Sequence, residues 1–363
     1  MELLCIGNTL VDIFAKSEEG LDRQFDLKDE PQHISMDKMR DILSVLPDFT
    51  VCSGGGAANV AKIASLLGIE TGFIGALGVM PDPDRENSDP AKSESDQFGK
   101  LFEQELDMAG VKSVFIKKTS PTGICLMLKL PDESIKIAAA PSAALELSAE
   151  DLEQDLVQDM IRNSQLVVLD GFMLGREELV HHVLELADRY GNAVAIDLSS
   201  AGLAYERALE IVTYARAYPL IIFMNEDEAY AFYKAVSKEY NIGENKINSK
   251  DSLNESLDPD LINLFKDFTA DDIFPVLVVK LGIRGAIVFA GGNIFREETI
   301  PVIPLETTGA GDTFCAAFLA AFIREKSFSE CASLGNRAAR EVLNVNGSQA
   351  DVKALKQLGR FLK

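Results

Sequence analysis

The segment Glu306–Phe314 reads Glu-Thr-Thr-Gly-Ala-Gly-Asp-Thr-Phe and leads directly into an apolar run, Cys315–Ile323, that we expect to form a buried helix. Glycine and alanine at the start of a helix expose backbone N–H groups that have no intrahelical partner, and the positive end of the helix dipole favours an anion such as phosphate there. Asp312 would be repelled by that phosphate, so it is better suited to take a proton from a group that attacks the phosphate. An anion site with a base beside it is the minimal arrangement for phosphoryl transfer onto a hydroxyl, and only the other motifs of the chain make this interpretation preferable to the following one. The alternative is a tight loop in which Asp312 only caps a helix.

A second glycine-rich segment, Ser53–Ala61, reads Ser-Gly-Gly-Gly-Ala-Ala-Asn-Val-Ala and resembles a turn that opens a helix. A dinucleotide-binding fingerprint would need glycine where Asn59 stands and would follow the first strand of the chain, so this function is disfavoured. A phosphate-binding P-loop sequence does not occur anywhere in the chain. Two interpretations stay open: a purely structural turn, or close approach of the backbone to a small ligand with the Asn59 amide as donor and acceptor.

Three further segments place polar residues or glycines after apolar runs. Asp12 follows the first run and is either an exposed turn acid or an acceptor for two neighbouring hydroxyls of a polyol. Asn225 and Glu228 follow Leu220–Met224, and they either interact with a helix dipole or hold Mg²⁺ and its waters. The segment Lys280–Gly285 ends another run in a glycine turn that suits a nucleotide lying against the backbone.

These segments need a scaffold, and the sequence predicts an α/β fold. Short apolar runs typical of buried strands alternate with amphipathic stretches typical of helices, which indicates a central, mostly parallel sheet covered on both faces. Ligands of such sheets gather at the carboxyl ends of the strands. The expected strands are Leu3–Ile6, Thr71–Ile74, Leu166–Leu169, Ala193–Ile196, Leu220–Met224 and Val276–Val279. The expected helices include Ala57–Leu67, Asp96–Ala109, Arg176–Tyr190 and Glu206–Ala217.

Two kinds of segment interrupt this alternation. Val114–Lys117, Gly123–Lys129 and Ser134–Ala138 are typical of antiparallel strands, and with part of residues 11–50 they could form a small β-sheet lid. Met80–Ser95 and Ser237–Asp272 are polar insertions that we expect to be exposed loops, the second partly helical.

Composition excludes several classes of function. A formal net charge of −22 gives no long-range attraction to nucleic acid or to an anionic membrane. Five cysteines without a C-x-x-C pair suit reduced thiols, and three histidines make a histidine-based hydrolase or metal enzyme a poor prediction. An acidic residue at position 2 and short apolar runs argue against a signal peptide or membrane span, so we expect a soluble, cytoplasmic protein.

The order of these motifs resembles the ribokinase (PfkB) family of carbohydrate and nucleoside kinases over nearly the whole chain. The motifs are Gly-Gly-x-x-x-Asn, Asn-x-x-Glu, Leu-Gly-x-x-Gly and Thr-Thr-Gly-Ala-Gly-Asp-Thr-Phe. Three stretches are most similar to the adenosine-kinase-like branch: Val194–Ser199, Phe223–Ala229 and Ser333–Ala339.

The resemblance implies an ATP- and Mg²⁺-dependent kinase that phosphorylates a primary hydroxyl of a sugar or nucleoside. Asp312 would be the general base. The other implied sites are an anion hole (Gly309, Ala310, Gly311), a substrate site (Asp12, Gly55, Gly56, Asn59), Mg²⁺ and phosphate ligands (Asn225, Glu228) and a nucleotide border (Lys280, Gly282, Gly285, Asn336). Some relatives also hold K⁺ with backbone carbonyls, and the candidates in this chain are Glu306, Thr308, Val342, Val345 and Gly347.

The family fold implies a core of residues 1–10, 51–111 and 140–363 and a discontinuous lid of residues 11–50 and 112–139. A homodimer formed through the lid is a further prediction. The chain departs from the family at Asp132–Lys136, where the lid usually carries a Gly-Glu-Arg turn, and at Met80–Ser95, so the identity of the substrate stays open. A catalytically inactive regulatory or scaffold protein is the alternative function. A nucleotide-dependent oxidoreductase is weakened by the missing fingerprint.

Overall fold

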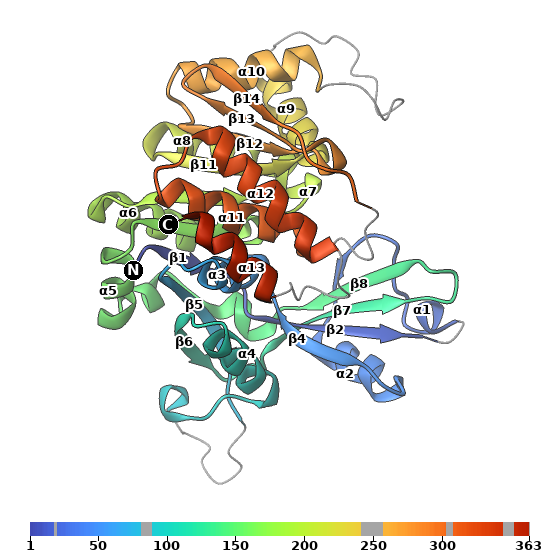
Figure 1. Cartoon of the computed structure of the whole chain (residues 1–363). Coiled ribbons are helices and arrows are strands. Elements are labelled where there is room, and N and C mark those ends of the chain that lie inside the picture. Colours follow the sequence, from blue (N-terminus) through green and yellow to red (C-terminus); the bar gives the residue numbers. More distant parts are fainter. Residues whose placement is uncertain (18–19, 81–88, 241–256, 303–307, 344–351, 363) are drawn as a thin grey trace.

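The computed structural model describes residues 1–17, 20–80, 89–240, 257–302, 308–343 and 352–362, and these residues form two β-sheets with helices (Figure 1). The large sheet has nine strands in the order β14-β13-β12-β11-β10-β9-β1-β5-β6, and the small sheet has five in the order β3-β8-β7-β2-β4. The predicted α/β fold with a small second sheet is confirmed.

Seven neighbouring strands of the large sheet are parallel, and two at one edge are antiparallel. The parallel strands are β1 (Leu3–Ile6), β5 (Thr71–Gly78), β6 (Lys112–Lys118), β9 (Leu166–Asp170), β10 (Ala193–Asp197), β11 (Leu220–Asn225) and β12 (Val276–Lys280). The antiparallel edge consists of β13 (Ala286–Ala290) and β14 (Asn293–Glu297). All six predicted strands are confirmed, because an unbroken apolar run suits a strand that is buried on both faces.

Helices cover both faces of the large sheet, and successive residues of β1 belong to different cores. Leu3 and Cys5 pack in one hydrophobic cluster, whereas Leu4 and Ile6 pack in the other. The first cluster includes residues of α3 (Gly56–Leu66), α4 (Gln97–Met108), α11 (Ala310–Ile323), α12 (Phe328–Leu343) and α13 (Val352–Leu358). The second includes residues of α5 (Asp155–Arg162), α6 (Glu177–Tyr190), α7 (Ala201–Glu206), α8 (Ala208–Ala217), α9 (Glu226–Tyr240) and α10 (Pro259–Ala270).

The small sheet stands beside the large one and carries α1 (Leu21–Gln24) and α2 (Met36–Val45) (Figure 1). Its strands are β2 (Leu10–Lys16), β3 (Gln32–His33), β4 (Thr50–Gly54), β7 (Gly123–Lys129) and β8 (Ile135–Ala140). Val11 and Ile13 of β2 are fully buried in the same cluster as Met39 and Ile42 of α2. We call this sheet with α1 and α2 the lid.

Two expectations about the lid are corrected. Val114–Lys117 lies in β6, which pairs in parallel with β5 in the large sheet and not with the lid. β6 is an edge strand of the large sheet, where Phe115 lies near Phe73 and Phe102, with ring centroids 6.0 and 5.9 Å away, while Lys112 is exposed. Residues 51–54, which we assigned to the core, belong to β4 and pair with β2 in the lid.

The two polar insertions are described only in part, because residues 81–88 and 241–256 lie outside the described ranges. The first insertion ends in a short 3-10 helix, η1 (Pro90–Lys92). The second begins in α9 and ends in α10, so its expected partial helicity is confirmed. Within the described ranges, none of the helices combines the length and the apolar character needed to cross a membrane.

Candidate active site

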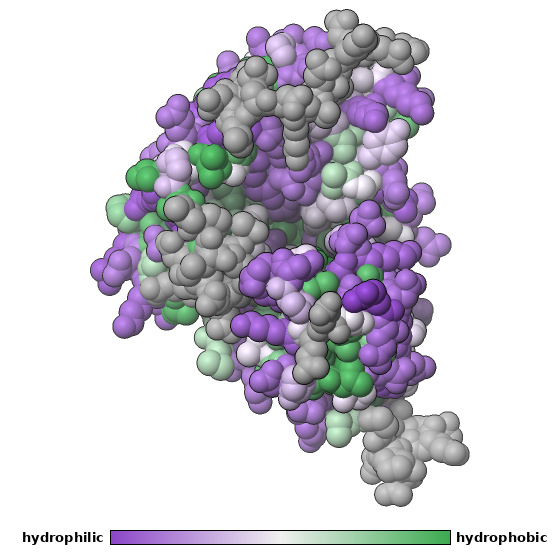
Figure 2. Space-filling view, turned by 90° about the vertical axis from the view of Figure 1, so that its right-hand side faces the viewer, coloured by the Kyte–Doolittle hydropathy of each residue, from purple (hydrophilic) through white to green (hydrophobic). Residues whose placement is uncertain are grey.

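Several strands of the large sheet end in a polar residue at the same edge, as expected for a parallel sheet. Asp170, Asp197, Asn225 and Lys280 are the last residues of β9, β10, β11 and β12. The amino termini of α3 and α11 lie at this edge, because Asn59 of α3 contacts Asp312 of α11 and Gly311 lies beside Lys280. Figure 2 shows the molecule from the lid side and a hollow between the core and the lid.

The Gly-Ala-Gly-Asp segment forms the beginning of α11. Gly309 precedes the helix with φ +77°, a left-handed conformation that favours glycine. The N–H of Thr313 is bonded to the carbonyl oxygen of Gly309 at 2.9 Å, so the N–H groups of Ala310, Gly311 and Asp312 precede the intrahelical ladder. These N–H groups are suited to an anion, and the anion hole stays a prediction.

Asp312 is buried in this first turn. The Asn59 side chain donates a hydrogen bond from Nδ2 to Asp312 Oδ2 at 2.8 Å. Burial is the main cause of a raised pKa of Asp312, which lies at about 6; the negative charges of Asp197 and Asp170 act in the same direction, whereas Asn59 and Lys280 oppose the shift. A carboxylate with a pKa near neutrality suits general-base catalysis better than an ordinary aspartate.

Lys280 supplies a cation beside the same turn. Its Nζ atom donates to both carboxylate oxygens of Asp197, at 2.8 and 2.6 Å. Burial disfavours the charge of Lys280, but Asp197 and Glu228 outweigh burial and raise its pKa, so the ammonium stays charged. A Cβ atom on Gly311 would lie only 3.3 Å from Lys280 Nζ. The ammonium therefore lies beside the anion-binding turn, where an acidic protein needs a local cation to bind phosphate.

Asn225 and Glu228 contact each other at the start of α9. The backbone N–H and the side-chain amide of Asn225 donate to the two Glu228 carboxylate oxygens at 2.7 and 2.8 Å. The N–H of Glu228 donates to Asn225 Oδ1 at 2.9 Å, so the pair caps the helix reciprocally. Burial raises the pKa of Glu228 to about 7. The capping role is therefore observed, while the predicted role in Mg²⁺ binding stays a prediction.

The predicted substrate residues gather around the turn between β4 and α3. A Cβ atom on Gly55, at φ +88°, would lie 2.5 Å from the carbonyl oxygen of Asn8, so only glycine fits there. A Cβ atom on Gly56 would lie 3.5 Å from Asp312 Oδ1, so Gly56 lies beside Asp312 and its partner Asn59. Asp12 comes from the lid, where β2 pairs with β4, and is 7 % exposed. A Cβ atom on Gly54 would lie 2.1 Å from Asp12 Cγ, so the structure brings Asp12 of the lid next to the turn that contains Gly55 and Gly56.

A buried network fastens β4 to the core next to this turn. Lys62 of α3 donates to the backbone oxygen and the hydroxyl of Ser53, both at 2.8 Å. Glu105 of α4 accepts from the N–H and the hydroxyl of Ser53, both at 2.7 Å. The last residues of β4 are therefore held by two core helices.

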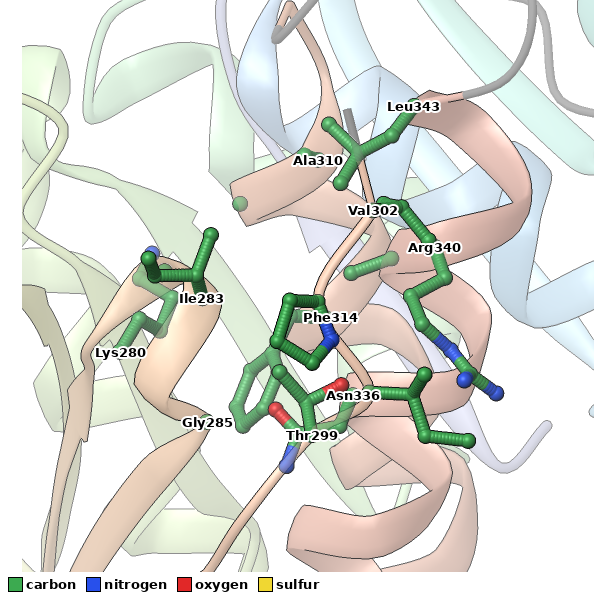
Figure 3. Close-up of a pocket in the computed structure, with 15 residues that line it drawn as sticks. Lys280, Ile283, Gly285, Thr299, Val302, Ala310, Phe314, Asn336, Arg340 and Leu343 are labelled. Carbon is green, nitrogen blue, oxygen red and sulfur yellow. The ribbon is translucent and has the colours of Figure 1, made fainter. Parts of the chain in front are cut away.

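A cavity of about 250 Å³ lies on the other side of the α11 amino terminus (Figure 3). Lys280, Gly282, Gly285 and Asn336 line it, as do Ala310 and Gly311 of the first turn of α11. The apolar residues of its lining are not apparent as site residues in the sequence: Ile283, Ile300, Pro301, Val302, Phe314, Ala339 and Leu343. Figure 3 shows Lys280 and Ile283 on the wall opposite Asn336, Arg340 and Leu343 of α12. An apolar slot with one end at an anion-binding turn fits a flat base that carries phosphates.

The predicted K⁺ ligands are only partly described, since Glu306, Val345 and Gly347 lie outside the described ranges. Thr308 directly precedes Gly309, and Val342 is buried near the end of α12. The cation site stays a prediction.

Three charged residues of the site were missed in the sequence: Asp170, Asp197 and Arg176. Asp170 and Asp197 are the final residues of buried strands, which is the same signal that identified Asp12. Arg176 precedes two glutamates at the start of α6, and this context does not distinguish it from an exposed arginine.

Comparison with known proteins identifies relatives over most of the chain. Residues 94–355 match the family described as pfkB family carbohydrate kinase. The chain is 25 % identical over 324 residues to a 5-dehydro-2-deoxygluconokinase of Halalkalibacterium halodurans, covering 87 % of this chain and 86 % of the relative. It is also 25 % identical over 359 residues to adenosine kinase 2 of Arabidopsis thaliana, covering 95 % and 94 %. The solved adenosine kinase of Sinorhizobium meliloti is similar in fold, with a TM-score of 0.77, 23 % identity and coverage of 100 % and 99 %.

Proposed function

This chain belongs to the pfkB family of carbohydrate kinases, and on that premise we propose that it transfers the γ-phosphoryl group of ATP to a primary hydroxyl of a sugar or nucleoside. The observation that carries the proposal is the position of Asp312. Its carboxylate has a pKa near neutrality, is hydrogen-bonded to Asn59, and lies in an anion-binding turn beside the Lys280 ammonium.

In the proposed reaction, Asp312 takes the proton of the acceptor hydroxyl as the hydroxyl oxygen attacks the γ-phosphorus. The bond from the γ-phosphorus to the β,γ-bridging oxygen breaks, and ADP leaves with that oxygen. The N–H groups of the Gly309–Gly311 turn stabilise the charge on the transferring group, because they are fixed before the reaction begins. Lys280 lies on the nucleotide side of the turn, where its charge can reach the phosphates.

The proposed position of ATP follows from the two sides of the turn. The base would occupy the cavity between Gly282, Gly285 and Asn336, where apolar side chains replace water around the ring. The acceptor would lie on the side of Asn59, with Asp12 of the lid and the backbone of Gly55 and Gly56 around its other hydroxyls. The phosphates would then lie between the two pockets, against α11.

Mg²⁺ fits the oxygen-donor chemistry at Asn225 and Glu228. Both Glu228 oxygens already accept hydrogen bonds from Asn225, so we propose that Glu228 holds the ion through water. In the described ranges, no group of three or more His, Cys, Asp or Glu side chains could hold a metal, which suits an ion bound mainly by phosphates and water. When bound, Mg²⁺ neutralises phosphate charge. Asn225 and Glu228 keep the end of β11 in place.

The proposed reaction does not by itself define the class of acceptor. Relatives are named 5-dehydro-2-deoxygluconokinase and adenosine kinase, which act on a sugar acid and on a nucleoside by their names. Both kinds of substrate offer a hydroxyl to the base, so Asp312 does not discriminate between them. We infer that the lid decides, because its Asp12 meets the parts of the substrate away from the reacting hydroxyl.

A screen of ATP consumption with adenosine and other nucleosides, ribose, fructose and keto-deoxy sugar acids tests the proposal. We expect ADP release with one of these acceptors and its loss in Asp312→Asn. Absence of turnover with every acceptor, together with intact ATP binding by calorimetry, would instead favour the catalytically inactive regulatory or scaffold protein.

We also infer a reducing compartment, the cytoplasm, because all five cysteines are free and four of them are buried. The homodimer through the lid remains a proposal, and light scattering of the purified protein tests it.

A further inference from the structure

Asp170 is a buried carboxylate that the proposed reaction does not use. It ends β9, is 3 % exposed, and within the described ranges neither of its oxygens makes a hydrogen bond of normal geometry. Burial raises its pKa, while the nearby N–H groups of Asn8, Ala57 and Phe172 oppose the shift. A Cβ atom on Gly7 would lie 2.8 Å from Asp170 Oδ2. The carboxylate is therefore enclosed by the turn after β1 and by the first turn of α3.

Arg176 is the cation whose charge stabilises Asp170. Its guanidinium donates from Nη1 to the carbonyl oxygen of Ala144 and from Nη2 to Asn8 Oδ1, both at 2.7 Å. Asn8 lies between β1 and β2, where the chain enters the lid. Ala144 lies in η2 (Ser142–Glu146), just after β8, where the chain has left the lid. Arg176 thus connects the point where the chain first enters the lid with the point where the chain finally leaves it.

The pair lies directly behind the proposed acceptor site. A Cβ atom on Gly56 would lie 3.4 Å from Asp170 Cβ and 3.5 Å from Asp312 Oδ1, so Gly56 separates the two acids. Asn59, the partner of Asp312, lies one turn further along α3. Burying a charge is unfavourable unless other groups compensate it. Here the compensating groups are the backbone N–H groups and the arginine that shape the acceptor turn.

We propose that Asp170 and Arg176 are positioning residues for the acceptor hydroxyl. Asp170 holds the Gly7–Asn8 turn and the positive end of α3, while Arg176 holds the Asn8 side chain and η2. Together, Asp170 and Arg176 hold Asn59 of the core helix α3 against Asp312. They also hold the start of β2, the lid strand that carries Asp12. This inference rests on the proposed function, since its readout is turnover of the acceptor.

Steady-state kinetics of Asp170→Asn, Arg176→Gln and the double variant test the proposal. Misplacement of a reacting group by about 1 Å can cost about a hundredfold, so we expect each single variant to lose about ten- to a hundredfold in kcat/KM for the acceptor. We expect KM for ATP to stay within about twofold, because the cavity for the base lies beyond α11. The double variant should lose no more than the single variants, because the two residues act as one unit.

Two further variants separate positioning from stability. Arg176→Lys keeps the charge, but an ammonium cannot reproduce the planar, two-ended guanidinium contact to Ala144 and Asn8, so its acceptor kcat/KM should fall even if it folds normally. Glu2→Gln is the matched control, because it breaks the half-buried contact of Glu2 with Arg324 at the opposite edge of the sheet. Its melting temperature should fall while the acceptor KM stays unchanged.

Three outcomes would overturn the proposal. The variants could have a lower melting temperature with unchanged kcat/KM for the acceptor, or their losses in kcat/KM could multiply in the double variant. The third is an equal rise of KM for the acceptor and KM for ATP. Failure of the proposed function is separate, since in that case the wild-type protein itself would consume no ATP with any acceptor.

Discussion

The two halves of the active-site cleft are built in opposite ways. Among the described residues, those that line the cavity proposed for the nucleotide base all lie in the core between Lys280 and Leu343, and most of them are apolar. The half proposed for the acceptor combines Asp12 of the lid with three core segments, which supply Gly55 and Asn59, Asp170, and Asp312, and it holds several buried charges.

This difference suggests how each half works. An apolar slot binds a flat ring by removing it from water and tolerates small shifts, because apolar burial has no preferred direction. Proton transfer depends on geometry and on pKa, so the acceptor half needs fixed charges even though burying them is unfavourable. We therefore expect variants in the acceptor half to alter kcat and acceptor KM, and variants in the nucleotide half to alter KM for ATP.

The largest difference between an effect on catalysis and an effect on ATP binding is expected for Asp312→Asn. The amide keeps the shape of the side chain but cannot accept the hydroxyl proton, and a positioned base contributes about 10²–10⁴-fold. We expect kcat at saturating substrates to fall at least ~10²-fold, with ATP binding by calorimetry retained. Turnover close to that of the wild-type protein would show that Asp312 is not the base.

Asp12→Ala should weaken binding of the sugar or nucleoside acceptor and leave ATP binding unchanged. Without the Asp12 carboxylate as hydrogen-bond partner, hydroxyls of the substrate stay unpaired in the closed site, at a cost of about 1–3 kcal/mol each. Calorimetry should therefore show weaker acceptor binding and unchanged ATP binding. Asp41→Ala is a matched control in the lid, because Asp41 is exposed on α2. Loss of ATP affinity in Asp12→Ala would mean that the two halves have been interchanged.

Ala339→Trp should produce the converse result by filling the cavity from α12. Loss of about 1–2 kcal/mol of apolar contact with the base corresponds to roughly a tenfold rise in KM for ATP or more. The acceptor KM should not change. Ser333→Trp, on the same helix but outside the cavity lining, should leave both constants unchanged. If Ala339→Trp altered only the acceptor constants, the base would not occupy this cavity.

The pH dependence should reveal Asp312 directly. Its pKa is raised to about 6, so kcat/KM should fall about tenfold for each pH unit below 6 as the base is protonated. Stability has the opposite dependence: the folded state binds this proton more tightly than the unfolded chain, so the contribution of Asp312 favours folding at low pH and is lost as the pH rises through 6. Asp312→Asn should therefore melt at a higher temperature than the wild-type protein at pH 7. A lower melting temperature there would contradict the raised pKa.

The smallest effect is expected from a monovalent cation beside Thr308 and Val342. Replacing K⁺ with tetramethylammonium at constant ionic strength should lower kcat/KM several-fold, because a bound cation would order the N–H groups of the anion hole and reduce repulsion from this acidic protein. Unchanged kcat/KM would exclude the cation site.

Much of the fold could be predicted from local pattern. The strands β1, β9 and β12 follow from unbroken apolar runs, and α3 and α6 follow from helical periodicity, because each pattern reports burial along a single element. The assignment of Lys112–Lys118 to the lid was wrong, because a short apolar run flanked by lysines suits an edge strand of either sheet. Which sheet a strand joins depends on pairing with distant residues, here Thr71–Gly78.

The sequence by itself determined the parts of the site that are contiguous: the Gly-Ala-Gly-Asp start of α11, the glycine turn before α3 and the Asn-x-x-Glu segment that begins α9. In these segments, the chemistry depends on the backbone and on spacings of a few residues. Only the tertiary structure decided that Asp170 and Asp197 face Asp312, that Arg176 reaches Asn8 and Ala144, and that burial brings the pKa of Asp312 to about 6. Proton affinity depends on charges and desolvation from residues far apart in the chain, and those distances exist only after folding.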